Sequence, residues 1–421
     1  MKKRILALVL IAVMAFGIAA CTQKPVAPTI TYWSMWAADS PQGLVINEAI
    51  KAFTASTGIQ VQVEFKGSAQ ATELGTALSA GTVVDLFDGD LQAVLDNFGD
   101  YTLGLDELVN KAYEDLGGDT YRSTQNTALL SFAEERAGLK NFADSSKLHS
   151  IAYMPEVLVI IYNKDLFKDA GITLPPVSWA ALESACKELI AADIVPFTFD
   201  NAYLPALFGY GMSRLIGATK TYDMVQDRDF TNEAVQEYAA TWAEMVGNGY
   251  VSEAAAANAL PAGLTDEMAA GTAAMYLGSS AQLAQLAELA PDTNWGAFAW
   301  PSMEGTGDAS TAASFVSKSF AIHKDTAYPD ETFQLVRWLT TGSWDQKLAD
   351  QAAVIPAATD TTCPELFADV QAMLIASTSR LHWAVNMEAD ADIAAAITTA
   401  FQKLLAGEIT AEEFAAALES L

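Results

Sequence analysis

Residues Met154–Trp179 read MPEVLVIIYNKDLFKDAGITLPPVSW, and this stretch decides the fold. Val157–Tyr162 is a run of six apolar residues rich in β-branched types, which is typical of a strand buried on both faces of a parallel sheet. A short helix is expected from about Asp165, and Gly171 suits its end because glycine readily adopts a left-handed conformation. Ser178 is expected to cap the helix that follows. The stretch therefore predicts a strand–helix unit of an α/β protein.

The N-terminal residues have the pattern of a bacterial export signal. Residues 1–20 begin with basic side chains, continue with an apolar run over 5–18 and end in small residues. Ile18–Cys21 resembles the bacterial lipobox, which implies removal of the preceding lipoprotein signal peptide and lipidation of Cys21. Residues 21–28 would then be a lipidated tether that holds the protein on the extracytoplasmic side of the cell membrane. The alternative is an ordinary signal sequence followed by a chance cysteine.

Composition indicates a large, globular and strongly acidic protein. The chain has 421 residues, of which 51% are hydrophobic, and a formal net charge of −29 from 23 basic and 52 acidic residues. The length beyond the signal exceeds one compact core, so two lobes are expected. Because affinity for nucleic acid comes mainly from Lys and Arg on phosphate, we expect no nucleic-acid partner.

Cysteine and histidine usage gives no support for a metal or a cofactor. His149, His323 and His382 are scattered along the chain without metal-ligand spacing. Cys186 lies on the apolar stripe of the helix after Ser178, so a buried core thiol is expected. A disulfide between Cys186 and Cys363 is permitted outside the cell, but the sequence cannot place the two residues within bonding distance.

Strands and helices alternate through the first part of the chain. Ile30–Trp36 reads as a strand that runs into an aromatic loop, Ile59–Phe65 alternates apolar and polar residues, and Val83–Phe87 is a further apolar strand. Such alternation predicts a mostly parallel α/β lobe. Because ligands bind beyond the carboxyl ends of parallel strands, the loops Trp33–Asp39 and Asp88–Gln92 are candidate site loops.

Several segments together resemble a known family in the same order along the chain. The segments are YWSMWAAD from Tyr32, SAGTVVDLFDGD from Ser79, VLVIIYNKDLFKDAGITLPPVSW from Val157, GTAAMYLGSS (Gly271–Ser280), WGAFAWP (Trp295–Pro301), Phe315–Pro356 and Phe401–Leu421. They resemble the extracellular solute-binding proteins of ABC importers, in the sugar-binding family that includes maltose-binding protein. The aliphatic run followed by Tyr-Asn-Lys-Asp-Leu-Phe is the most specific of these matches.

The chain also departs from the family pattern at three places. Gly278–Ser280 stands where many members have Gly-x-Trp, so that stacking tryptophan is absent. Ala180–Ala181 replaces the usual acidic residues, and Ala312–Ser314 replaces a glycine-rich turn. These departures leave the identity of the sugar open.

The resemblance implies a two-lobe periplasmic-binding-protein fold, with a mostly parallel sheet and flanking helices in each lobe. Lobe 1 would comprise residues 29–155 and 318–354, and lobe 2 would comprise residues 156–317 and 355–421. Three chain crossings would form a hinge, and the lobes would close around the ligand as rigid bodies. The implied function is capture of a mono- or oligosaccharide between the lobes and its delivery to an ABC permease, by a monomer without enzymatic activity or cofactor.

A sugar site needs aromatic rings against the C–H faces of the pyranose and carboxylates or amides at its hydroxyl rim. The two loops and the resemblance together give the candidate ligand-binding residues, which are Trp33, Trp36, Asp39, Asp88, Asp90, Gln92, Asp200, Asn201, Tyr203, Trp300, Trp383 and Asn386. Structural roles remain open for these residues, namely strand core for Trp33, helix capping for Asp88, hinge packing for Trp300 and core packing for Trp383. Asp200 and Tyr203 fit a structural role as well as a ligand contact.

Two other functions are compatible with the sequence. A polyamine bound on the same fold would use Asp39, Asp88, Asp90 and Asp200 together with tryptophans through cation–π contacts. A secreted glycoside hydrolase would need two opposed carboxylates about 5–10 Å apart, for which Asp88 and Asp90 are candidates. No nucleophile elbow, metal motif or phosphate loop accompanies them.

Overall fold

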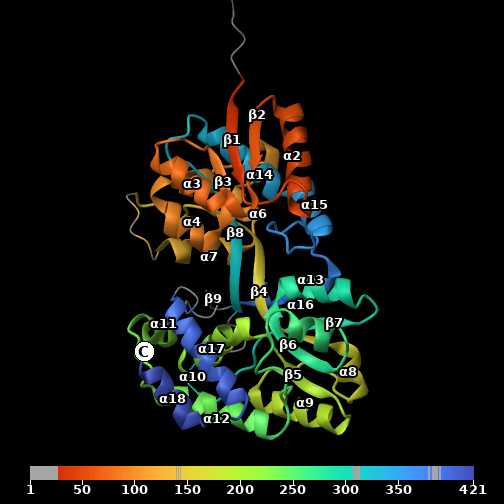
Figure 1. Ribbon diagram of the computed structural model, residues 1–421. Helices are drawn as coiled ribbons and strands as arrows, with labels where there is room; N and C mark the ends of the chain where they lie inside the picture. Colours follow the sequence, from red (N-terminus) through yellow and green to blue (C-terminus); the bar gives the residue numbers. More distant parts are fainter. Residues whose placement is uncertain are drawn as a thin grey trace, which may run out of the picture.

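The computed structural model consists of two lobes joined by long shared strands (Figure 1). It describes residues 27–421 except 139, 141, 143, 306, 308–312, 378–379, 382–386 and 388–389. Strands β4 (Ile151–Asn163) and β8 (Ala313–Ile322) run antiparallel to each other and pass from one lobe into the other. The predicted two-lobe α/β fold is therefore confirmed. The predicted signal peptide and Cys21 lie outside the described residues.

The sheet of lobe 1 has the strand order β2-β1-β3-β8-β4. Strand β1 (Thr29–Ser34) pairs in parallel with β2 (Gln60–Phe65) and with β3 (Leu86–Asp90), as the alternating pattern predicts. Pairing turns antiparallel between β3 and β8 because β8 returns from lobe 2, so the sheet as a whole is mixed. Its helices are α2 (Pro41–Thr57), α3 (Gln70–Ser79), α4 (Leu91–Phe98), α5 (Asp106–Asn110), α6 (Tyr121–Thr124), α7 (Thr127–Gly138), α14 (Pro329–Thr340) and α15 (Gly342–Ala352).

These helices cover both faces of the lobe 1 sheet. Helices α2, α14 and α15 pack together on one side, while α3 and α4 lie on the other (Figure 1). Helix α2 begins at Pro41 after the capping residue Ser40 and ends at Gly58, whose φ is 80°. The inward face of α2 carries Ile46, Ala49 and Phe53, all fully buried. The hydrophobic spacing predicted for this helix is therefore confirmed.

Strand β3 lies three residues further along the chain than the apolar run Val83–Phe87 predicts. Asp88 and Asp90 are part of the strand and pair with Phe320 and Lys318 of β8. Pairing with β8, and not hydrophobicity, sets which residues form β3, because the backbone of β8 pairs with residues 86–90. Asp88 is therefore inside the sheet, where the sequence predicted a loop.

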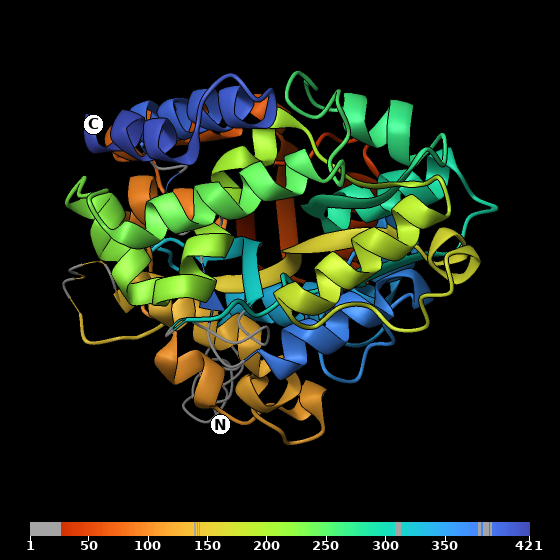
Figure 2. The same ribbon diagram turned by 90° about the horizontal axis from the view of Figure 1, so that it is seen from below.

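Lobe 2 is built on the second half of β4. This half pairs antiparallel with β6 (Ala273–Ser279) and β7 (Trp295–Phe298), and β5 (Val195–Thr198) adds in parallel to β6. The mostly parallel sheet expected for lobe 2 is therefore wrong, because β4 enters from lobe 1 and runs opposite to β6 and β7. The surrounding helices are α8 (Lys164–Asp169), α9 (Trp179–Ala191), α10 (Leu204–Ile216), α11 (Ala218–Gln226), α12 (Glu233–Gly247), α13 (Ser280–Leu289), α16 (Ala368–Ala376), α17 (Ala391–Leu405) and α18 (Ala411–Glu419). Helices α17 and α18 pack with α10 and α12 on one side of the lobe (Figure 2).

Short elements complete the described chain. The turns of 3-10 helix are η1 (Gly67–Ala69), η2 (Gly99–Tyr101), η3 (Glu114–Leu116), η4 (Asn201–Tyr203) and η6 (Glu365–Phe367). A turn of π-helix, η5, spans Gly263–Met268. The two-residue strand β9 (Arg380–Leu381) pairs with the start of β8.

The deciding stretch folds largely as its sequence predicts. Asn163 caps α8, with its side-chain oxygen accepting from the backbone of Asp165, and Gly171 beyond the helix has a φ of 82°. The hydroxyl of Ser178 accepts from the backbone N–H of Ala181 and caps α9. The strand is longer than the apolar run, because pairing with β8 extends it back past Pro155 to Ile151.

Neither Cys186 nor Cys363 forms a disulfide. Cys186 is fully buried on α9, as predicted, and both it and Cys363 are free thiols. Among the described residues, no helix has the length and hydrophobicity needed to cross a membrane. The same part of the chain has no cluster of three or more His, Cys, Asp or Glu side chains that could hold a metal ion.

Two of the predicted crossings contain a left-handed residue that is not glycine. Met154 has a φ of 50° at a register shift in β4, and Ala353 has a φ of 49° just after α15. A residue with a Cβ atom is strained in this region by about 1–2 kcal/mol. The backbone is therefore strained at two of the predicted crossings.

Ala353 provides a direct test of this strain. Ala353→Gly should raise the free energy of unfolding by about 0.5–1 kcal/mol, because glycine adopts the left-handed cap without a Cβ penalty. Ala352→Gly, one residue earlier in the last turn of α15, is the matched control and should lower it by up to about 1 kcal/mol. Denaturant unfolding measures both variants. Equal destabilisation by the two substitutions would contradict the strain at Ala353.

Candidate functional site

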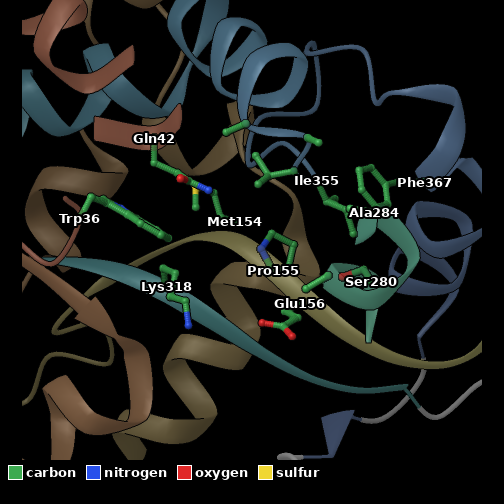
Figure 3. Close-up of a pocket in the computed structure, with 14 residues that line it drawn as sticks. Trp36, Gln42, Met154, Pro155, Glu156, Ser280, Ala284, Lys318, Ile355 and Phe367 are labelled. Carbon is green, nitrogen blue, oxygen red and sulfur yellow. The ribbon is translucent and has the colours of Figure 1, made fainter. Parts of the chain in front are cut away.

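A pocket of about 220 Å³ lies where the three predicted crossings meet (Figure 3). Pro155 and Glu156 of the first crossing, Lys318 of the second, and Val354 and Ile355 of the third all line it. Gln42 at the start of α2 and Trp36 from the loop after β1 close the side of lobe 1, while Ser280, Ala281 and Ala284 of α13 close the side of lobe 2. The pocket is thus built from both lobes.

Two side chains of opposite charge line the pocket, one from each predicted lobe. Glu156 on β4 accepts a hydrogen bond from the hydroxyl of Ser279 in lobe 2. Lys318 on β8 has its Nζ 3.7 Å from a carboxylate oxygen of Asp90 in lobe 1. Each charged group is therefore held within its own lobe, and together they leave the pocket lining close to neutral. This contrasts with the strongly acidic chain as a whole.

Two aromatic residues line the pocket, Trp36 from the loop after β1 and Phe367 from η6, and Trp36 is the larger. Its side chain is half-buried and extends along one wall (Figure 3). The indole Nε1 donates to the hydroxyl of Tyr153 at 3.0 Å, and the backbone N–H donates to the hydroxyl of Ser34 at 3.3 Å. The ring is therefore held at its polar edge, which leaves a flat apolar surface for a solute.

Asp88 lies beneath this wall and is fully buried. Its carboxylate accepts from the hydroxyls of Tyr32 at 2.7 Å, Ser34 at 3.0 Å and Tyr153 at 3.3 Å, and from the backbone N–H of Met35. Burial raises the pKa of Asp88 to about 6, against the opposing effect of these hydrogen bonds. The prediction of direct ligand contact does not agree with this position, because β3 carries Asp88 into the sheet.

Asp90 and Gln92 lie at the start of α4. The carboxylate of Asp90 caps this helix by accepting from the backbone N–H groups of Gln92 at 3.1 Å and Ala93 at 3.3 Å. The amide of Gln92 donates to Asp96 at 3.0 Å. The sequence left helix capping open for Asp88, but Asp90 is the residue that caps α4. Asp90 also contacts Lys318, which lines the pocket.

Trp33 and Asp39 lie elsewhere on lobe 1. The ammonium group of Lys66 lies 4.1 Å from the centre of the Trp33 ring, and the indole N–H donates to Glu64 at 3.0 Å. Asp39 is exposed in the turn before α2. Neither residue lines the pocket. The cation over its ring gives Trp33 a structural partner on the surface of its own lobe.

Asp200, Asn201 and Tyr203 follow β5 in lobe 2. Asp200 is fully buried, where it accepts from the hydroxyl of Tyr276 and from the backbone N–H of Gly263, both at 2.7 Å, and burial raises its pKa. The backbone N–H of Asn201 donates to the carbonyl of Asn258 at 2.9 Å.

Tyr203 is nine-tenths buried and packs edge-on against Tyr276 at 6.0 Å. Burial raises the pKa of Tyr203, and the nearby charge of Glu156 adds to this effect. Tyr203 therefore lies close to the lobe 2 side of the pocket, while Asp200 is held in the interior.

Trp300 belongs to the core of lobe 2. It is fully buried among Trp179, Trp242 and Tyr210, with ring centres 6.0–6.2 Å away. The predicted ligand contact at Trp300 is thus wrong, because the chain after β7 turns inward before it crosses. The two remaining predicted contacts, Trp383 and Asn386, lie outside the described residues.

Of the residues that line the pocket, sequence reasoning named only Trp36 as a ligand contact, and the polar or charged residues with long side chains that it missed are Gln42, Glu156 and Lys318. All three lie on helices or strands and not on the loops where ligand contacts were expected. Glu156 and Lys318 nevertheless border predicted crossings. Polar residues next to a predicted hinge are therefore a signal that would have found these two.

The two lobes and the pocket between them have the architecture of a solute-binding protein. The sequence matches the model of the bacterial extracellular solute-binding protein family over residues 37–345, and the chain belongs to this family. Proteins of this family act outside the cytoplasm. No curated protein sequence matches this chain significantly.

Solved structures of similar proteins share the fold over nearly the whole chain. The apo form of RafE from Streptococcus pneumoniae has a TM-score of 0.73 at 16% identity, covering 94% of this chain and 98% of its own. A probable secreted solute-binding lipoprotein from Streptomyces coelicolor has a TM-score of 0.72 at 16% identity with the same coverage. A sugar transporter protein from Bacillus licheniformis in complex with stachyose has a TM-score of 0.61 at 18% identity, covering 93% and 98%.

The different positions of Trp36 and Trp300 predict different effects of truncation on stability. Trp300→Ala should lower the free energy of unfolding by about 3–5 kcal/mol, because it leaves a large cavity in the core of lobe 2. Trp36→Ala should lower it by only about 1 kcal/mol, since the ring is half-buried and loses one hydrogen bond. Denaturant unfolding compares the two variants. A larger loss for Trp36→Ala would contradict these assignments.

Proposed function

We propose that this protein is a lipid-anchored receptor that captures a carbohydrate between its lobes and delivers it to an ABC permease. The observation that carries the proposal is the half-buried Trp36 in the lining of a pocket that joins both lobes at all three predicted crossings. A pyranose ring presents a flat C–H face that suits this indole. Glu156 can accept from sugar hydroxyls, whereas Lys318 and Gln42 can donate to them.

Similar structures support a carbohydrate as the solute. RafE has been solved in complex with raffinose, the Bacillus licheniformis protein in complex with stachyose, and another similar structure is a chitin oligosaccharide binding protein. Their names describe their own ligands, and at 16–18% identity they do not specify the sugar for this chain. They do favour carbohydrates over other classes of solute for the first binding experiments.

The four acidic residues that a polyamine site would need do not lie together. Asp88 and Asp200 are buried in different lobes, Asp90 caps a helix beside Lys318, and Asp39 is exposed outside the pocket. A polyvalent cation would meet one carboxylate, Glu156, together with a competing ammonium group. The nearly neutral pocket lining therefore favours a neutral solute.

The hydrolase alternative also lacks its required geometry. Catalysis of glycoside hydrolysis needs two carboxyl groups that reach the same glycosidic bond. Asp88 is fully buried and Asp90 is committed to capping α4, so this pair is not available to a substrate. Membership of a binding-protein family favours the same conclusion.

Anchoring and delivery complete the proposal. The motif Ile18–Cys21 supports lipidation at Cys21, and residues 21–28 would tether a monomeric receptor to the membrane. An anchor of this kind raises the local concentration of the receptor around its permease. Closure of the lobes would give the permease a surface that differs between the empty and the loaded protein.

A thermal-shift screen of the purified protein tests the class of solute. Raffinose, stachyose, chitin oligosaccharides, simple sugars, spermidine and amino acids are compared at saturating concentrations. At least one carbohydrate should raise the melting temperature, since a ligand at 100 times its Kd stabilises the folded state by about 2.7 kcal/mol. A shift with spermidine and with no carbohydrate would overturn the sugar assignment.

Two tryptophans of one segment provide the matched variants for the site. Trp36→Ala should abolish most of the thermal shift and raise the Kd at least about tenfold, because stacking on the indole is lost. Trp33→Ala should leave the Kd nearly unchanged, because Lys66 covers that ring outside the pocket. Isothermal titration calorimetry measures both. Equal effects of the two substitutions would place the solute elsewhere.

A further inference from the structure

The buried carboxylate of Asp88 connects to the pocket through a chain of hydrogen bonds. Tyr153 donates to Asp88 at 3.3 Å, and the hydroxyl of Tyr153 accepts from the indole N–H of Trp36 at 3.0 Å. We propose that Asp88 is a positioning residue for solute binding, because it fixes the Tyr153 hydroxyl and thereby the orientation of the Trp36 ring. This proposal rests on the function proposed above, in which the solute stacks on Trp36.

The chemistry of the three groups sets the direction of this chain. An ionised carboxylate only accepts hydrogen bonds, and an indole N–H only donates. The Tyr153 hydroxyl has a single proton, which must go to Asp88 and leave its oxygen free to accept from Trp36. Hydrogen bonds in such a chain polarise each other, so the charge on Asp88 strengthens the bond to the indole. A neutral group at this position would lose both the direction and the polarisation.

The same carboxylate also holds the backbone that carries Trp36. The backbone N–H of Met35 and the hydroxyl of Ser34 both donate to Asp88, and the backbone N–H of Trp36 donates to the Ser34 hydroxyl. Trp36 is therefore fixed at two points, its backbone and the edge of its ring. One buried charge orients both points.

Tyr153 is well placed to connect this wall to the hinge. It lies on β4 opposite Lys318, immediately before the left-handed residue Met154 at the first predicted crossing. The Tyr153 ring stacks on Phe320 with 4.2 Å between ring centres and 18° between planes, which fixes the hydroxyl in space. The stacking face of the pocket is thus tied to the strand that bends between the lobes.

The chain of hydrogen bonds from Asp88 through Tyr153 to Trp36, called the relay below, should depend on pH through the ionisation of Asp88. Its pKa is raised to about 6 by burial, and the titratable groups in contact with it are Tyr32 from β1 and Tyr153 from β4. Among the described residues no cation forms an ion pair with it. A protonated carboxyl must donate its own proton, so one of the present donors has to turn away. Solute affinity should therefore fall as the pH is lowered from 7 to 5.

Stability should change in the opposite direction over the same range. The pKa of Asp88 in the folded state lies above its unfolded value, so the folded protein binds the proton more tightly. Its contribution to stability therefore increases as the pH falls from about 6 towards 4. A loss of affinity caused by general acid unfolding would instead accompany a loss of stability.

Two buried tyrosines form a matched pair for the test. Tyr32 and Tyr153 both donate to the same oxygen of Asp88, and only Tyr153 contacts Trp36. Tyr153→Phe should raise the Kd for the carbohydrate found in the screen about tenfold, the cost of one broken hydrogen bond at a buried polar group. Tyr32→Phe should change the Kd less than about twofold. Equal Kd values for the two variants would overturn the proposal.

The dependence of the Kd on pH in Asp88→Asn distinguishes a positioning role from a purely structural one. A purely structural role of Asp88 would not make the Kd depend on its ionisation. The Kd of the wild-type protein should rise between pH 7 and pH 5, whereas that of Asp88→Asn should be raised at pH 7 and flat across the range. An unchanged pH dependence in Asp88→Asn would show that another group titrates and would contradict the relay.

A measurement without ligand separates this proposal from the proposed function. The chain has nine tryptophans, and their indole N–H groups give separate signals in a ¹H–¹⁵N correlation spectrum, in which Trp36→Phe identifies the Trp36 signal. Tyr153→Phe and Asp88→Asn should shift that signal, and Tyr32→Phe should not. The wild-type signal should also titrate near pH 6. A Trp36 signal that is unchanged by Tyr153→Phe, by Asp88→Asn and by pH would overturn the relay, whether or not a carbohydrate binds.

Discussion

The carboxylate of Asp88 is the interaction on which the proposed site depends. A fully buried charge without an ion-pair partner is costly, and it persists here because four donors converge on it from β1, from β4 and from the loop after β1. Three of these donors, Ser34, Met35 and Tyr153, also hold Trp36 in place or precede it directly in the chain. The hydrogen bonds that satisfy Asp88 therefore also fix the conformation of residues Ser34 to Trp36.

Strands β4 and β8 explain why the pocket lies where it does. They pair with each other over Ile151–Val157 and Phe315–Phe320, where they pass between the lobes, and residues of all three predicted crossings line the pocket beside them (Figure 1). The left-handed residues Met154 and Ala353 bend the backbone at two crossings, and Glu156 and Lys318 place opposite charges on neighbouring strands. A solute in this pocket would contact both lobes and the strands that join them. In the proposed function, such contacts would couple binding of the solute to the angle between the lobes.

The fold could be predicted from the sequence because its signals are local. The apolar run Val157–Tyr162, the cap Ser178 and the turn at Gly171 act within a few residues, and the structure has a strand, a helix cap and a left-handed residue at these places. The parallel pairing expected for this strand is wrong, because β4 pairs antiparallel with β6, β7 and β8. The site depends on strand pairing over long distances, which a single sequence does not reveal.

Pairing with β8 moves β3 by three residues and turns Asp88 from an expected ligand contact into a buried support. Glu156 and Lys318 were missed for a related reason, since they lie within strands and become pocket residues only when the two lobes meet. The role of Trp300 was predicted wrongly because a bulky aromatic residue near a crossing fits a hinge and a core equally well by sequence.

The most direct measurement is a crystal structure of the protein with the carbohydrate that gives the largest thermal shift. The sugar ring should lie against Trp36 between the two lobes, with hydroxyl groups on Glu156 and Lys318. A sugar bound away from Trp36, for example in the groove between α7 and α16, would contradict the central claim.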